Sequence, residues 1–125
     1  MRIINASAAL RFQARSRDES FEKMVECAQK SLAIDDSDPD VHTLLAKIHS
    51  SQKEYDKAIN EGEKSVSLGP NSAENYANLG MTYRYVGRFE DSIRMTEKAI
   101  RLHPYYPDWY LYSLEYSYYY LGEYE

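Results

Sequence analysis

Apolar residues in this chain recur at spacings of three and four, which places them on one face of an α-helix. One such stripe runs from Tyr76 to Tyr83, and a second runs from Phe89 to Ile100. Gly87 lies in the short break between them and can adopt the left-handed backbone conformation that ends a helix. The pattern therefore predicts two helices joined by a tight turn.

This helical pair repeats along the chain with a period of 34 residues. Pro70 and Pro104 fall between successive units, where the missing amide and rigid ring of proline stop one helix before the next begins. Because one unit cannot bury its apolar stripes alone, such units stack on one another. The sequence therefore predicts an all-α solenoid of antiparallel helix pairs, with about seven helices. The columns that match in three units are Phe21, Tyr55 and Phe89; Val25, Ile59 and Ile93; Lys30, Lys64 and Lys98; Leu32, Val66 and Ile100; and Ile34, Leu68 and Leu102.

Residues 1–125 are predicted to form one domain of four units, two of them incomplete. The domain comprises a degenerate first repeat at 3–38, a second repeat at 39–72, a third at 73–107 and a truncated fourth at 108–125, with its first helix only. In the first unit only the second helix follows the pattern, so residues 3–17 are expected to form a capping or degenerate first helix. Lys53 stands in the column of Gly87, and the second unit is expected to pack more loosely than the third.

The third unit resembles the signature of the tetratricopeptide repeat, in which an aromatic residue, Leu-Gly, Tyr, a further core residue and a closing Pro follow in order. The residues that carry the resemblance are Tyr76, Leu79, Gly80, Tyr83, Phe89 and Pro104. It covers about residues 19–124 and implies a right-handed superhelix of antiparallel helix pairs. Residues 55–124 also resemble the repeats that trail the catalytic domains of bacterial adenylate/guanylate cyclases.

The resemblance further implies a binding surface, because the first helix of each unit lines the concave face in this family. Lys47, Asn78 and Arg84 are expected to hold a peptide carboxylate or main chain, and the aromatic residues to hold an apolar or proline-bearing side chain. The alternative is that Lys47 and Arg84 are ordinary solvated charges. Only Asn78 falls on a position of the family's chaperone-tail clamp, which disfavours an adaptor of that kind. The predicted peptide-binding residues are Lys47, Asn78, Met81, Arg84, Trp109, Tyr112, Tyr116 and Tyr119.

The amino-acid composition argues against nucleic acid and membranes as binding partners. The net charge of -5 leaves no basic face for nucleic acid, and no polybasic or membrane-length apolar run is present. Cys27 is the only cysteine, which excludes an internal disulfide, and its place among apolar residues predicts a buried thiol. A reducing, cytoplasmic location is the expectation that follows.

Candidate catalytic and metal-binding residues each have a stronger structural interpretation. His42 and His49 are spaced to share a helix face, but they occupy the columns of two tyrosines and are expected to be hydrogen-bonded core residues. The acidic run at residues 35–40 would need Gly and Glu where Asp40 and Ala46 stand to form a calcium loop. No nucleophile with a base and no glycine-rich phosphate loop is present. We therefore predict no catalytic residue, no cofactor and no metal.

Three functions stay open on the sequence. The first is a protein-interaction module that binds a peptide or partner segment in the concave groove. The second is a homodimer or scaffold joined through the C-terminal helix, because nine of the thirteen tyrosines lie beyond residue 104 and the fourth unit lacks a partner helix. The third is a non-catalytic regulatory tail of a larger enzyme, such as a nucleotide cyclase.

Overall fold

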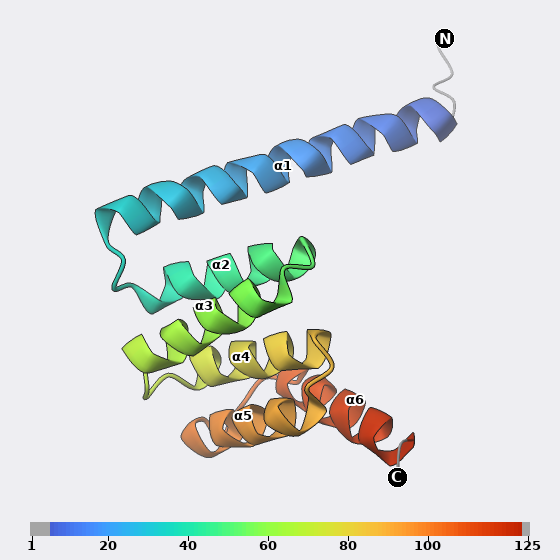
Figure 1. Ribbon diagram of the computed structural model, residues 1–125. Helices are drawn as coiled ribbons and strands as arrows, with labels where there is room; N and C mark the ends of the chain where they lie inside the picture. The colour runs from blue at the N-terminus through green and yellow to red at the C-terminus, as the bar shows by residue number, and fades with distance from the viewer. Residues whose placement is uncertain (1–5, 124–125) are drawn as a thin grey trace.

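The protein is a stack of six α-helices in the part of the chain that a computed structural model describes, the backbone of residues 6–123 and the side chains of residues 17–122. Successive helices from α2 onward run antiparallel and lie side by side in chain order (Figure 1). This confirms the predicted α-solenoid. No helix in the described range combines the length and apolarity needed to span a bilayer. The helices are α1 (Ala6–Ile34), α2 (Pro39–Ser51), α3 (Tyr55–Leu68), α4 (Ala73–Tyr85), α5 (Phe89–Leu102) and α6 (Trp109–Glu123).

The first unit differs from the prediction, because its two expected helices are one continuous helix, α1, of 29 residues. Its N-terminal half projects well past the end of α2 (Figure 1). Residues 15–20 contain neither Gly nor Pro, so nothing in the sequence interrupts the helix there. This continuity accounts for six helices where about seven were predicted. Residues 3–5 lie outside the described range, as do the side chains of residues 6–16.

The unit that lacks a separate first helix leaves part of α1 uncovered. Met24 is half-buried and Ser31 is exposed, whereas their counterparts Ser92 and Ala99 in the third unit are fully buried. Cys27 is also exposed, so the prediction of a buried thiol was wrong. The helical spacing correctly placed Cys27 beside a packed stripe, but burial needs a neighbouring helix, and no helix of the described range covers Cys27.

The helix boundaries of the second and third units have local causes. The Asp38 carboxylate accepts a hydrogen bond from the Asp40 amide at 2.9 Å and caps α2, with Pro39 in the first turn. Ser72 caps α4 by accepting from the Asn75 amide at 3.4 Å. Gly87 ends α4 with a φ of 84°, as the sequence predicted.

Lys53 ends α2 in the same left-handed conformation, with a φ of 61°. A side chain with a Cβ atom is strained there by about 1–2 kcal/mol, whereas glycine is not. We therefore expect Lys53→Gly to raise the free energy of unfolding by about 1 kcal/mol, after the greater entropy of glycine in the unfolded chain is subtracted. Urea denaturation measures this change. Lys53→Ala keeps the Cβ and is the control: a similar gain in that variant would contradict the explanation by backbone strain.

The third unit is held together by an unusually close approach of α4 and α5. A Cβ placed on Gly80 would lie 2.5 Å from Thr96 Oγ1 and 3.2 Å from the Ser92 carbonyl oxygen. The Ser92 hydroxyl donates to the Gly80 carbonyl at 2.7 Å, which ties the two helices together where the glycine lets them meet. Tyr76 and Ala99 pack beside this contact in a cluster with Tyr110 of α6. The packed core thus runs on from α4 and α5 into α6.

Candidate functional site

Two adjoining hollows lie between α2 and α4, the first helices of the second and third units. One has a volume of about 290 Å³ and the other about 190 Å³, and Lys47 lines both. Together they form one surface, named here the α2/α4 groove. The larger hollow is lined by Lys47, Ser50, Ser51, Met81, Thr82 and Tyr85, and the smaller by Asp40, Thr43, Leu44, Lys47, Glu74, Asn75 and Asn78.

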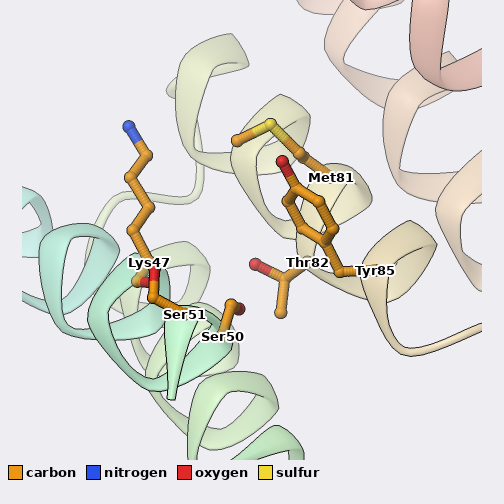
Figure 2. A pocket seen from close by; sticks show the side chains of 6 residues that line it. All are labelled: Lys47, Ser50, Ser51, Met81, Thr82 and Tyr85. Carbon is orange, nitrogen blue, oxygen red and sulfur yellow. The ribbon is translucent and has the colours of Figure 1, made fainter. Parts of the chain in front are cut away.

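The larger hollow has one cationic and one apolar wall. Figure 2 shows the Lys47 side chain on one side and Met81 with Tyr85 on the other, while Ser50 and Thr82 point into the space between them. The Thr82 hydroxyl donates to the Asn78 carbonyl at 3.1 Å, one turn back in its own helix. Lys47 is exposed, and no described carboxylate pairs with its ammonium group. A ligand can therefore meet both an apolar surface and a free cation.

The smaller hollow is polar and lies toward the helix starts. Asp40 is in the first turn of α2 and Glu74 is in the first turn of α4. Asn75, which is buried and lines this hollow, is held in place by two hydrogen bonds: its Nδ2 donates to the carbonyls of Ser65 and Gly69, at 3.3 and 3.1 Å. Burial raises the pKa of the nearby Tyr110, and the negative charge of Glu74 raises it further. The Glu74 carboxylate thus contributes a negative charge to this end of the groove.

Arg84 lies outside both hollows. Its guanidinium carbon is 4.9 Å from the ring centroid of Tyr85, 4.8 Å from that of Tyr112 and 5.1 Å from that of Tyr116. Stacking of this kind links α4 to α6 by cation–π attraction. The residue predicted to hold a peptide carboxylate is thus engaged by aromatic rings of the protein itself.

The four aromatic residues predicted on α6 form a separate surface beside the groove. Tyr112 and Tyr116 have ring centroids 6.0 Å apart, one helical turn from each other, and the rings of Trp109 and Tyr110 are nearly perpendicular with centroids 4.6 Å apart. Tyr119 packs against Tyr120 at 5.3 Å and is largely exposed. None of them lines either hollow of the groove. Of the predicted site residues, the structure therefore brings together Lys47, Asn78 and Met81.

Residues missed by the sequence prediction include Ser51, Thr82, Leu44 and Asn75, which line the groove from its flanks. The prediction followed the residues at the centre of each concave stripe. Ser51 and Thr82 lie one position beyond Ser50 and Met81, on the sides of α2 and α4 that border the hollow. The repeat columns alone do not show which flank of a helix will face a gap.

His42 and His49 have different surroundings. His42 is only 5% exposed, and its two ring nitrogens lie 2.5 Å from Glu61 Oε2 and 2.6 Å from the Asp36 carbonyl oxygen. It is a hydrogen-bonded core residue, as predicted. His49 is half-buried, with Nδ1 3.6 Å from Glu54 Oε1. Among the described residues, no three His, Cys, Asp or Glu side chains group as metal ligands do.

Comparison with known proteins agrees with the repeat columns. Residues 39–72 and 73–106 each match the tetratricopeptide repeat profile, which together is more than half of the chain. The chain belongs to the tetratricopeptide-repeat family. No curated protein sequence matches the chain as a relative. The two matched tetratricopeptide repeats contain α2 with α3 and α4 with α5, so the groove lies between the first helices of the two profile-matched units.

Solved structures, two of them of tetratricopeptide domains, share the fold at low sequence identity. The Sgt2 domain from Aspergillus fumigatus aligns with a TM-score of 0.75 and 18% identity, over 89% of this chain and 74% of that one. MamA aligns with a TM-score of 0.68 and 24% identity, over 98% of this chain and 68% of that one. The second tetratricopeptide domain of human RPAP3, solved with an HSP70 peptide, aligns with a TM-score of 0.67 and 16% identity, over 86% of this chain and 88% of that one.

Proposed function

We propose that this tetratricopeptide chain is a protein-interaction module that binds an extended segment of a partner protein in the α2/α4 groove. The observation that carries the proposal is the pair of hollows that adjoin at Lys47, between the first helices of the two profile-matched repeats. Extended peptides bind through main-chain hydrogen bonds and side-chain pockets, and the groove offers donors, acceptors and an apolar wall for both. The RPAP3 domain of similar fold was solved with a peptide, which supports a ligand of this class.

Two substitutions at the centre of the groove, one at its cationic and one at its apolar wall, test this proposal. A phage-displayed library of random short peptides, selected on the full chain, supplies the probes. We expect Lys47→Glu or Met81→Glu to weaken binding of the selected peptides at least about tenfold, because the first removes the ammonium donor of the groove and the second places a charge on its apolar wall. Fluorescence anisotropy measures the dissociation constants.

The matched control for Lys47→Glu is Arg101→Glu, which makes the same change of charge on the exposed end of α5. It is expected to leave the dissociation constants unchanged. Equal affinity of the wild type and both groove variants for every selected peptide would show that the peptides bind elsewhere, and would remove the groove from the proposal.

Self-association through α6 is a second candidate function. Leu111 is 37% exposed and Tyr118 is 54% exposed, although the residues 35 positions earlier, Tyr76 and Tyr83 of α4, are buried. The step is 35 and not 34 because the fourth unit has one inserted residue near Pro107. The Tyr118 hydroxyl donates a hydrogen bond of 3.2 Å to Glu97 of α5, and its ring is exposed beside it. An exposed apolar helix face of this kind fits a second copy of the chain.

Analytical ultracentrifugation tests the second candidate. We expect the wild type to sediment as a dimer at high concentration, and the double variant Leu111→Glu, Tyr118→Glu to sediment as a monomer, because carboxylates on α6 would repel across the interface. Circular dichroism checks that both remain helical. A wild-type chain that stays monomeric at the highest concentration would exclude this function.

The resemblance of residues 55–124 to repeats that trail nucleotide cyclase domains remains a prediction about genomic context. A regulatory tail would use the same groove or the same α6 surface toward the enzyme that precedes it. The reading frame upstream of Met1 tests this: a catalytic domain encoded in continuous frame would support it.

A further inference from the structure

Hydrogen-bond acceptors gather at the end of the α2/α4 groove that lies toward the helix starts. The exposed side chains of Asp40 and Glu74 line the smaller hollow from opposite helices. Neither carboxylate pairs with a cation among residues 17–122. Among the described side chains, Lys47, at the border with the larger hollow, is the one cation that lines this space. The hollow therefore carries more negative than positive charge.

Asn78 adds a third acceptor. It is 8% exposed, and its side-chain nitrogen donates to the Glu74 carbonyl at 2.9 Å. Because a carbonyl oxygen can only accept, the amide nitrogen must face Glu74, and this fixes which end of the side chain is which. The Asn78 side-chain oxygen is left without a donor in the described structure, in a residue that lines the hollow. An amide oxygen that no described protein group satisfies, on a side chain held in place at the surface of the hollow, favours a ligand that donates.

The helix dipole alone does not account for this arrangement. An acidic residue in a first turn stabilises its own helix, and Asp56 of α3 and Glu90 of α5 occupy such positions as well. Those two carboxylates line none of the hollows described for this protein. At the groove, by contrast, two carboxylates and a fixed amide oxygen from two helices converge on one space.

We propose that the groove selects a partner segment with a lysine or arginine side chain in the smaller hollow and a large apolar side chain against Met81 and Tyr85. Asn78 and Tyr85 are seven residues apart on α4, or about 10 Å along the helix axis. An extended peptide covers that distance in about three residues. Lys47 lies between the two side-chain positions and donates to the peptide's carbonyl groups. The inference rests on the proposed function and adds the chemistry of the partner.

Peptides selected from the same random library test the inference. We expect the wild type to enrich peptides with Lys or Arg about three residues from an aromatic or large aliphatic residue. The double variant Asp40→Asn, Glu74→Gln keeps the shape of both side chains and removes their charge. It is expected to bind the wild-type-selected peptides about tenfold more weakly, and to lose the enrichment of Lys and Arg when it is selected itself.

The control variant Asp56→Asn, Glu90→Gln removes equal charge from equivalent first-turn positions and is expected to keep both affinity and enrichment. Peptides that bind in the groove, as Lys47→Glu and Met81→Glu report, without enrichment of Lys or Arg would overturn this inference and leave the proposed function standing. Enrichment of Asp or Glu would overturn it as well. Peptides insensitive to every groove variant would overturn both.

Discussion

Replacing Gly80 by leucine is expected to lower the free energy of unfolding by about 3 kcal/mol, because α4 and α5 meet at this residue. A Cβ at Gly80 already falls 2.5 Å from Thr96 Oγ1, and Thr96 is fully buried and β-branched, so it cannot turn away. The helices must separate, which also breaks the hydrogen bond from Ser92 to the Gly80 carbonyl. Urea denaturation followed by circular dichroism measures the loss.

The matched control for this variant is Gly122→Leu, since a Cβ at Gly122 meets nothing within 4 Å. It is expected to leave stability unchanged or slightly higher, because leucine is the better helix former. A loss in Gly122→Leu as large as in Gly80→Leu would show that close packing is not the cause.

The repeat itself suggests a rescue for the contact at Gly80. In the second unit the same two columns contain Ala46, in place of Gly80, and Gly62, in place of Thr96. The glycine of the contact is therefore on the second helix of that unit and not on the first. Gly80→Ala combined with Thr96→Gly is therefore expected to cost less than the sum of the two single variants. Strictly additive losses would contradict this coupling between α4 and α5.

Glu61→Gln is expected to lower the free energy of unfolding by about 2 kcal/mol at about pH 6, because it leaves a buried imidazolium without its counter-charge. The side chains of His42 and Glu61 are 7% and 16% exposed. The Asp36 carbonyl can only accept, so His42 Nε2 must donate to it, and Nδ1 then carries the second proton toward Glu61. The pair joins α2 to α3, and the bond to Asp36 ties both helices to the α1–α2 loop.

The loss should depend on pH in a defined direction. Burial lowers the pKa of His42, but the hydrogen bonds to Glu61 and Asp36 and the charge of Glu61 outweigh it, so the pKa lies above its usual 6.5. A group with a raised folded-state pKa contributes stability that is complete below the unfolded pKa and is lost as pH rises through the folded one. The difference between wild type and Glu61→Gln should therefore shrink as the pH is raised to about 9.

Denaturation of both proteins across this range, with an NMR titration of the imidazole of His42, measures the effect. His49→Gln is the control, since His49 is half-buried and 3.6 Å from its carboxylate, and its effect is expected to stay within about 0.5 kcal/mol. A Glu61→Gln loss that grows toward high pH, or a His42 pKa below 6.5, would contradict the ionised pair.

The sequence located α2 to α5 because the information for these helices is local. Apolar spacing gave each helix its face, and the 34-residue columns aligned the units without any knowledge of their packing. The left-handed turn at Gly87 and the core position of His42 also followed from the columns. Each of these features depends on residues within one unit or on their counterparts in the next.

Features that depend on what lies opposite could not be predicted in this way. Cys27 is exposed because no helix in the described part of the chain covers it, and Arg84 is stacked among tyrosines because α6 lies close to α4. The position of each residue in its repeat was consistent with the predicted role, a buried thiol for Cys27 and a peptide contact for Arg84. The acceptors around Asn78 are likewise contributed by two helices that are 34 residues apart in sequence.

The sequence by itself determined that this protein is a stack of tetratricopeptide helix pairs, because helix formation and unit-to-unit burial follow from periodic apolar positions. Only the tertiary structure decided where the stack is open. A hollow arises where side chains of neighbouring helices fail to fill the space between them, and that depends on side-chain directions across helices. Lys47, Met81 and Asn78 therefore became one groove, and Arg84 part of the scaffold, only in the folded chain.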